Sequence, residues 1–428
     1  MLIQYFATLI FWSTIVFLAV FSTRIYFALL LVVFIPLSAF ATSAGLQMEG
    51  TSFSALGRSF LFVLLAATVL SLVRNRSHVP HGRPLYSLGA FLAWMVLKSV
   101  NTISISDSMS ALLQYLLVAS AFFLTAVMVR KGNERYVFSC IACSALIPLL
   151  VGILQLMIYY GVFPSWGFLK DGIYVRHTSG YNFAFVASIF THPNVFAHFL
   201  AIGVVLFILV ASEGLVDSRL RLPMLLTSIV MVFVLVFLST RGAIIGLLLG
   251  ISFVVLRRLR LTVLLFVVGT LMALYMFSDV LEHSLFRMGG AESQWNARNE
   301  LWRIGLDHLS LTGIGLGGII VGKVIHTEMG YMMAHNDYLK YLIETGIIGV
   351  LLFVAFVFDV LSLGYRTWRS PEKQPPVRAQ GALVLVTWAV FGVAMIAENL
   401  QFLHYLILPF TILGAFCGAN ETQEDSLS

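Results

Sequence analysis

A histidine and a carboxylate stand close together where a polar stretch meets a long apolar run. His335 and Asn336 begin the stretch HNDYLKYLIETGIIGVLLF, and Glu344 follows on the same predicted helix. Histidine is the side chain best suited to take a proton near neutral pH, so His335 could act as a general base. A single histidine at such a boundary can also be purely interfacial, but Asn336 and Glu344 beside it favour chemistry.

Arg241 stands between two apolar runs in FLSTRGAIIGLLLG, with almost no loop to solvate its charge. A charge at the centre of a membrane helix costs about 2.5–3.5 kcal/mol on insertion scales, so such residues usually mark function. The alternative is that the side chain extends to the membrane interface. Guanidinium groups bind phosphate oxygens in a bidentate way, so an anionic ligand is the chemistry that Arg241 predicts.

The polar stretch 161–194 carries further candidates. Arg176 lies within it, and His192-Pro193-Asn194 closes it directly before an apolar run. Proline is favoured in the first turn of a helix and asparagine at its cap, so this tripeptide predicts a helix start. His192 and Asn194 are therefore either capping residues or polar groups at the mouth of a site.

A second long polar stretch contains Arg298, with Trp295 and Trp302 at helical spacing from it. This spacing predicts an amphipathic helix that lies at the membrane interface. Arg298 belongs either to the charged face of that helix or to a site.

Glycines follow in the pattern G-x-G-x-G-G, which begins at Gly313 and includes Gly315. No predicted strand precedes the pattern, so a dinucleotide-binding fingerprint is rejected. We expect a flexible turn whose backbone N–H groups could face an anion.

The composition determines what kind of molecule must position these residues. Of 428 residues, 59% are hydrophobic and only 11% are charged, whereas a soluble domain carries about 25% charged residues. This excludes a soluble enzyme and a disordered chain, and predicts an all-α polytopic transmembrane bundle with about 12 spans. The apolar runs are 3–22, 25–43, 59–73, 85–100, 109–129, 136–160, 195–212, 222–240, 242–256, 261–279, 338–364, 380–397 and 402–419.

That makes 13 runs, and the division of the first 43 residues stays open, so twelve or thirteen spans are expected. Sixteen of the 26 Lys and Arg residues fall in one alternating set of linkers. Such linkers face the cytoplasm by the positive-inside rule, so nucleic acid is not needed to explain the net charge of +6. The candidate residues fall on the opposite, periplasmic side.

The long outer segments divide the chain into regions. We expect an N-terminal transmembrane bundle, a periplasmic loop, central transmembrane helices, a large periplasmic catalytic loop with short interfacial helices, C-terminal transmembrane helices and a polar tail. Their bounds are 1–160, 161–194, 195–279, 280–337, 338–419 and 420–428. No His/Cys cluster has zinc spacing, and the C-x-x-C at Cys140 lies in an apolar run that indicates ordinary helix packing.

Taken together, these residues resemble the O-antigen ligase and O-antigen polymerase family, bacterial inner-membrane glycosyltransferases with many spans. Four motifs carry the resemblance, in this order along the chain. They are R-x(3)-G…H-P-N at 176–194, S-T-R-G at 239–242, R-x(3)-W…G-x-G-x-G at 298–317 and H-N-x(9)-G-x-x-G at 335–349.

The resemblance implies a GT-C-like fold and a glycan donor linked to undecaprenyl diphosphate. It implies transfer to an acceptor hydroxyl on the periplasmic side, with inversion and without metal or cofactor. Arg176 and Arg241 would hold the diphosphate, and His335 would orient or deprotonate the acceptor. The remaining candidates would contact substrate: Arg298, Asn336, His192, Asn194, Glu344 and Gly315.

Three functions stay open. A polymerase would use the end of another lipid-linked repeat unit as acceptor, with a chain-length regulator as partner, and the Glu344 context and the H-P-N element favour it. A ligase would use lipid A–core. A flippase for lipid-linked glycans would show midplane charges, internal repeats and interrupted helices, whereas the spans look largely uninterrupted.

Overall fold

The structure is a computed structural model. It describes residues 13–34, 51–79, 82–100, 102, 105–164, 167–170, 172–178, 181–190, 192–238, 240–257, 302–303, 306–307, 309–316, 336–397 and 403–425. His335, Arg298 and the predicted span 261–279 lie outside these residues, as do most of the predicted interfacial helices.

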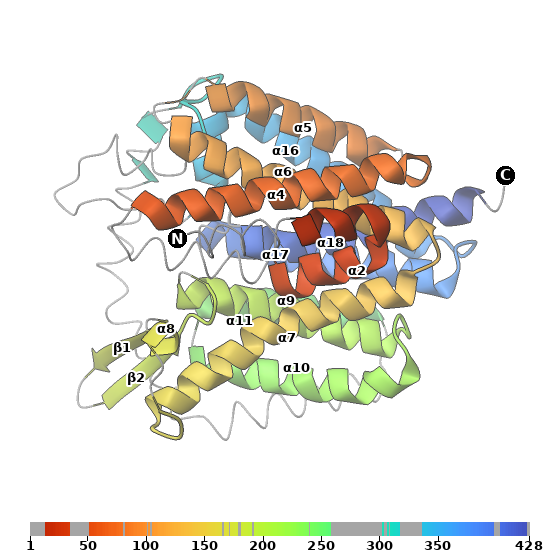
Figure 1. Cartoon of the computed structure of the whole chain (residues 1–428). Helices are drawn as coiled ribbons and strands as arrows, with labels where there is room; N and C mark the ends of the chain where they lie inside the picture. Colours follow the sequence, from red (N-terminus) through yellow and green to blue (C-terminus); the bar gives the residue numbers. More distant parts are fainter. Residues whose placement is uncertain are drawn as a thin grey trace.

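Long helices make up most of the described chain (Figure 1). They are α2 (Thr23–Leu29), α4 (Thr51–Arg74), α5 (Arg83–Val100), α6 (Ile105–Arg130), α7 (Glu134–Tyr159), α9 (Pro193–Ser212), α10 (Ser218–Leu238), α11 (Arg241–Arg257), α16 (Asp337–Arg369), α17 (Pro375–Ala397) and α18 (Leu403–Asp425). The short elements are the π-turn Leu30–Phe34, the 3-10 turn Arg76–His78, α8 (Gly167–Lys170), β1 (Ile173–Thr178) and β2 (Tyr181–Val186).

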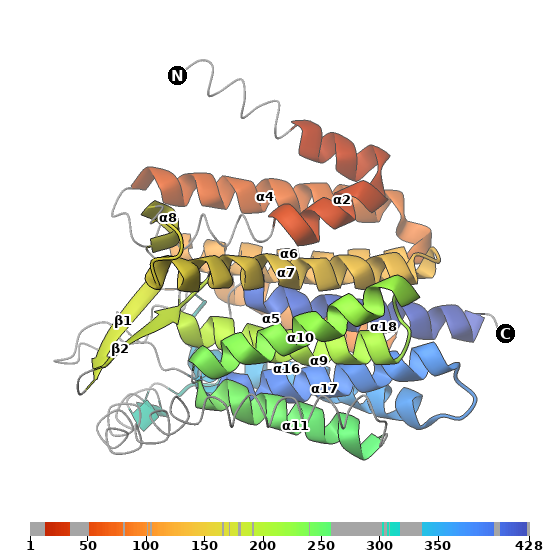
Figure 2. The ribbon, with the colours of Figure 1, turned by 90° about the horizontal axis from the view of Figure 1, so that it is seen from below.

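The long helices pack side by side as one bundle, and Figure 2 shows the same packing from a second direction. Within the described residues, six helices are long and apolar enough to cross a membrane. They are Ser108–Arg130, Glu134–Tyr159, Pro193–Ser212, Ser218–Leu238, Asp337–Arg369 and Pro375–Ile396. The chain is therefore a helical membrane protein with several spans, as the composition predicted. The count of about 12 and the GT-C-like arrangement stay predictions.

Helix α9 forms the centre of the bundle. Its residues from Val195 to Ala211 are all buried, and α7, α10, α11 and α17 contact it. A helix that is apolar on every face belongs in a core or a membrane, and α9 has protein on every side. The start of α9, at the H-P-N motif, is thereby held firmly at one end of the bundle.

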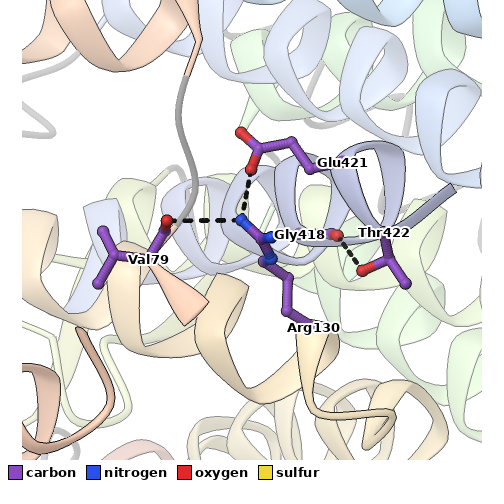
Figure 3. A network of polar contacts seen from close by, with 5 residues as sticks. All are labelled: Val79, Arg130, Gly418, Glu421 and Thr422. Atoms are coloured by element: carbon purple, nitrogen blue, oxygen red, sulfur yellow. Dashed lines mark hydrogen bonds and ion pairs between the residues drawn. The ribbon is translucent and has the colours of Figure 1, made fainter. Parts of the chain in front are cut away.

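The basic linkers gather at the opposite end. There Arg130, at the end of α6, donates hydrogen bonds to Glu421 at 2.8 Å and to the Val79 carbonyl at 3.4 Å (Figure 3). Nearby on α18, the Thr422 hydroxyl donates to the Gly418 carbonyl. The ion pair joins two helices 291 residues apart in sequence, so the ends of α6 and α18 are tied together.

Further contacts join the other basic linkers to this end. Lys131 donates to the side-chain oxygen of Asn75, and the Arg24 guanidinium lies 4.2 Å from the centre of the Tyr136 ring. Arg135 reaches Asp217 at 3.5 Å. We call this region the basic end. Its clustering fits the alternating charge of the linkers, and its cytoplasmic orientation remains a prediction of the positive-inside rule.

The expectation of an all-α chain is wrong at one place, because residues 161–194 contain a β-hairpin. Strands β1 and β2 are antiparallel, with Arg176 opposite Phe183 and Thr178 opposite Tyr181. The sequences IYVRHT and YNFAFV are rich in β-branched and aromatic residues and flank a Ser-Gly pair. This is the composition of a hairpin with a short turn. The hairpin projects from the end of the bundle opposite the basic end (Figure 1).

Candidate functional site

The predicted site residues differ in how far the structure describes them. Arg176 lies in strand β1, where its backbone pairs with β2. Arg241 is the first residue of α11, and its side chain is exposed. Asn336 is the N-cap of α16, where its side-chain oxygen accepts from the Leu339 N–H at 3.0 Å. His192, Asn194, Glu344 and Gly315 are described and are taken up below.

The H-P-N and S-T-R-G motifs meet at two neighbouring helix starts. His192 caps α9, and its Nδ1 accepts from the Asn194 N–H at 3.2 Å. The Thr240 hydroxyl donates to the Asn194 side-chain oxygen at 3.2 Å. Thr240 directly precedes Arg241, so this bond, which we call the Asn194–Thr240 junction, holds Arg241 beside the start of α9. Helix N-termini carry partial positive charge, so both helix starts and Arg241 favour an anion here.

The hairpin that carries Arg176 is anchored beside the same junction. The Tyr174 and His192 rings lie 6.2 Å apart, between centroids. On the other side, the buried Gln155 of α7 pairs with Ser188: it accepts from the Ser188 N–H at 2.8 Å and donates to the Ser188 carbonyl at 3.1 Å. Sequence reasoning missed Gln155, although a lone amide inside an apolar run was a usable signal.

Helix α16 is interrupted at Gly346, which has φ 70° and ψ −175°. This conformation is essentially restricted to glycine. It divides α16 into a first half that ends at Thr345 and a second half that begins at Ile347. The expectation that the spans are uninterrupted is wrong here, and the glycine of the H-N-x(9)-G-x-x-G motif is the reason.

The glycine-rich loop 309–316 fills this interruption. The N–H groups of Ile314 and Gly315 donate to the carbonyls of Ile343 and Glu344, each at 3.0 Å. In return, the N–H groups of Ile347 and Ile348 donate to the carbonyls of Ser310 and Leu311, each at 3.2 Å. We call this arrangement the α16 interlock. It satisfies the backbone groups that the interruption releases, as a protein buried in a membrane requires.

Close approach of neighbouring atoms, from backbone at Gly313 and from side chains at Gly349, explains the glycines on both sides of the interlock. A Cβ on Gly313 would lie 2.4 Å from the Glu344 carbonyl oxygen and from the Gly346 nitrogen. A Cβ on Gly349 would lie 2.1 Å from the Thr345 hydroxyl and 3.1 Å from the Trp94 ring. The expected flexible turn is therefore a packed segment over 309–316. The N–H of Gly315, which the sequence suggested for an anion, is bonded to Glu344.

Helix α5 closes the α16 interlock from outside. The Trp94 indole donates to the Thr345 carbonyl at 2.8 Å, and one turn later the Lys98 ammonium donates to the Gly313 carbonyl at 3.1 Å. The Thr102 hydroxyl donates to the Leu316 carbonyl at 2.7 Å. Sequence reasoning missed all three residues. Lys98 had a signal, because it is a charge in the predicted span 85–100.

Glu344 lies inside the bundle, with 2% of its surface exposed. The Lys340 ammonium on the previous turn is 3.9 Å from its carboxylate. The Tyr115 hydroxyl donates to the Tyr341 hydroxyl at 3.2 Å, so α6 meets the first half of α16 at this level. Glu344 therefore belongs to a buried polar layer just below the H-N motif.

Helix α17 links the interlock with the Asn194–Thr240 junction. The Tyr338 hydroxyl at the start of α16 donates to the Gly392 carbonyl of α17 at 3.2 Å. Gly246 of α11 faces the same turn of α17, since a Cβ added there would lie 3.3 Å from a methyl group of Val390. The described parts of the four sequence motifs therefore share one end of the bundle, which we call the motif end.

A family model described as O-antigen ligase matches residues 226–354. The match begins in α10, covers the S-T-R-G and H-N motifs and ends beyond the interruption in α16. Arg176 and the H-P-N motif lie before it. No curated protein matches the chain. The matched segment, which carries the G-x-G loop and the H-N-x(9)-G-x-x-G motif that form the interlock, is similar to the O-antigen ligase family.

Proposed function

We propose that the protein transfers a glycan from undecaprenyl diphosphate to an acceptor hydroxyl at the motif end of the bundle. The observation that carries this proposal is that the family match extends from S-T-R-G to H-N. Contacts through α17 hold the ends of these two motifs at the same end of the bundle. With the positive-inside rule, the motif end faces the periplasm of a bacterial inner membrane.

Arg241 and Arg176 are the proposed ligands of the diphosphate. Arg241 is exposed at the first residue of α11, where the helix dipole adds positive charge. The Asn194–Thr240 junction fixes this helix start, and the contact between Tyr174 and His192 holds the strand of Arg176 near it. Charge-assisted contacts of this kind neutralise the leaving group as its charge develops.

His335 is the proposed base. The acceptor oxygen attacks the anomeric carbon, the bond from that carbon to the diphosphate oxygen breaks, and His335 takes the hydroxyl proton. Attack from the face opposite the leaving group inverts the anomeric centre. Asn336 starts α16 directly after His335. In this proposal Arg298, His192, Asn194, Glu344 and Gly315 form or support the surroundings of the substrate.

The acceptor separates the two versions of this function. We favour the polymerase, in which the acceptor is another lipid-linked repeat unit and a chain-length regulator is a partner. The Glu344 context and the H-P-N element carry this preference. The ligase, with lipid A–core as acceptor, uses the same donor chemistry and the same residues.

Substitution of His335 by Ala tests the proposal in cells that depend on this protein for surface glycan. We expect transfer to fall by about 10²–10⁴-fold, the usual contribution of a general base. Loss of long chains with single repeat units still attached indicates the polymerase. Loss of all attachment with accumulated lipid-linked polymer indicates the ligase.

His78→Ala is the matched control, because His78 lies in the 3-10 turn at the basic end. Its glycan profile should equal that of the parent. A normal profile in His335→Ala, at equal protein level in the membrane, would contradict both versions of the proposed function.

A further inference from the structure

Lys98 carries a charge that is almost completely removed from solvent. Only 3% of its surface is exposed. Among the described residues, the Gly313 carbonyl is the hydrogen-bond acceptor of its ammonium, at 3.1 Å. An ammonium group buried in this way is costly unless nearby dipoles or charges compensate it. A buried charge of this kind is therefore a candidate for a structural or functional role.

The interruption of α16 supplies part of that compensation. The first half of α16 ends at the carbonyls of Ile343, Glu344 and Thr345, and a helix C-terminus carries partial negative charge. Loop 309–316 caps two of these carbonyls with its own N–H groups. The Lys98 ammonium, bound to Gly313 in that loop, therefore places positive charge where the half-helix ends.

The backbone of Lys98 also holds loop 309–316 in place. The Leu316 N–H donates to the Lys98 carbonyl at 3.5 Å, and Thr102 binds the Leu316 carbonyl at 2.7 Å. The loop is thus held between α5 on one side and the two halves of α16 on the other. In sequence, Leu316 and Asn336 flank residues 317–335, and both of these flanking residues are fixed to helices.

We propose that Lys98 is a positioning residue for the transfer reaction. It locks loop 309–316 into the interruption of α16 and so sets the first half of α16, which Asn336 caps and which His335 directly precedes in sequence. Lys98 does not touch substrate and acts through the interlock. This inference rests on the proposed function for its link to catalysis, whereas its structural part, the locking of the loop, does not.

The kinetic test compares Lys98→Met, which keeps the length and loses the charge, with Lys98→Arg, which keeps the charge. We expect Lys98→Met to lower kcat by about 10–100-fold, with KM for the lipid-linked donor within about twofold, because misplaced catalytic groups slow the chemical step. Lys98→Arg should restore most of the rate. Lys131→Met is the control, because Lys131 also donates to a neutral oxygen, but at the basic end; its rate should not change.

A labelling test measures how firmly loop 309–316 is held, and it does not require transfer activity. Leu316 is fully buried, so in a Leu316→Cys variant that otherwise lacks cysteine the thiol should resist a membrane-impermeant reagent. Adding Lys98→Met should raise the labelling rate at least tenfold, and Lys98→Arg should not. If Lys98→Met fails to accumulate, Lys98→Gln replaces it, because that change also removes the charge and keeps a polar side chain. Unchanged labelling in the substituted protein would overturn the proposal.

The labelling and transfer measurements together distinguish a failure of this inference from a failure of the proposed function. Faster labelling together with full transfer activity in Lys98→Met would refute the positioning role. Faster labelling in Lys98→Met, with transfer activity retained in His335→Ala, would refute the proposed base and leave the lock intact.

Discussion

Two junctions at the motif end hold the family motifs, and they are built differently. At the α16 interlock, main-chain groups bond main-chain groups across the Gly346 interruption in both directions. At the Asn194–Thr240 junction, a side-chain hydrogen bond of 3.2 Å joins two helix starts, and the guanidinium next to it is exposed. Backbone hydrogen bonds fix the segment that follows the proposed base, whereas a side-chain hydrogen bond lies next to the proposed diphosphate ligand.

The difference between the two junctions fits the different tasks of the proposed base and of the proposed diphosphate ligand. A proton acceptor must stay within hydrogen-bond distance of one atom, which rewards a rigid support. An arginine that binds a diphosphate gains from long reach and several donors, and it tolerates small displacements. We therefore expect substitutions at the interlock to cost stability, and substitutions at the Asn194–Thr240 junction to cost less.

The largest effect is expected from Gly346→Ala at the interlock. The new Cβ would lie 2.3 Å from the Gly313 nitrogen, and the backbone conformation itself costs about 1–3 kcal/mol for a non-glycine residue. We expect little folded protein in detergent, measured by size-exclusion chromatography and thermal unfolding. Gly89→Ala is the control, since a Cβ there meets nothing within 4 Å. A parent-like melting temperature for Gly346→Ala would show that the interruption is not required.

Trp94→Phe should have the next largest effect, because it leaves the Thr345 carbonyl without its indole donor. A buried acceptor left unsatisfied costs about 1–3 kcal/mol. Trp388→Phe is the matched control. Trp388 is buried, whereas Trp94 is half-buried, and the Trp388 indole N–H has no hydrogen-bond partner among the described residues. Equal losses of thermal stability in the two variants would mean that ring volume, and not the hydrogen bond, is what matters.

Thr240→Val should cost less, about 0.5–1.5 kcal/mol, the net value of one hydrogen bond. It removes the Asn194–Thr240 bond and keeps the shape of the side chain. Thr240→Ser retains the hydroxyl and should behave like the parent. Thermal unfolding in detergent checks the ranking. If Thr240→Val loses more stability than Trp94→Phe, the proposed contrast between the two junctions is reversed.

Arg135→Ala sets the baseline for the comparison. Its ion pair with Asp217 is 3.5 Å long and joins side chains that are 73% and 66% exposed. Solvent screens such pairs, so we expect a loss below about 0.5 kcal/mol. A drop in thermal stability as large as that of Thr240→Val would indicate that the basic end contributes more than its exposure suggests.

Much of the fold could be predicted from the sequence, because hydropathy alone determines where a chain can cross a membrane. Most of the described helices begin and end within a few residues of the predicted apolar runs, whereas α4 begins at Thr51, eight residues before the predicted run 59–73. The hairpin was missed because residues 161–194 were treated as one polar loop, although its two strands carry β-branched and aromatic residues on either side of Ser-Gly. A period-2 inspection of that loop would have found it.

The roles of the site residues stay predictions, and the sequence indicated only their local positions. The place of Arg241 between two apolar runs follows from a local rule. The interruption at Gly346 does not, because glycine occurs in many uninterrupted membrane helices and only a partner backbone reveals its purpose. Trp94 contacts Thr345 from 251 residues away, and no local pattern predicts a contact at that separation.

The interruption in α16 also constrains the order of assembly in the membrane. A helix with exposed carbonyls at its centre is unfavourable in hydrocarbon until other groups reach those carbonyls. Here the donors come from loop 309–316 and from Trp94. Lys98, which binds the Gly313 carbonyl of that loop, lies 215 residues before Gly313 in sequence. Helix α5 therefore has to be in place when α16 leaves the translocon. A chain that lost α5 would leave the Thr345 carbonyl at the centre of α16 without its indole donor.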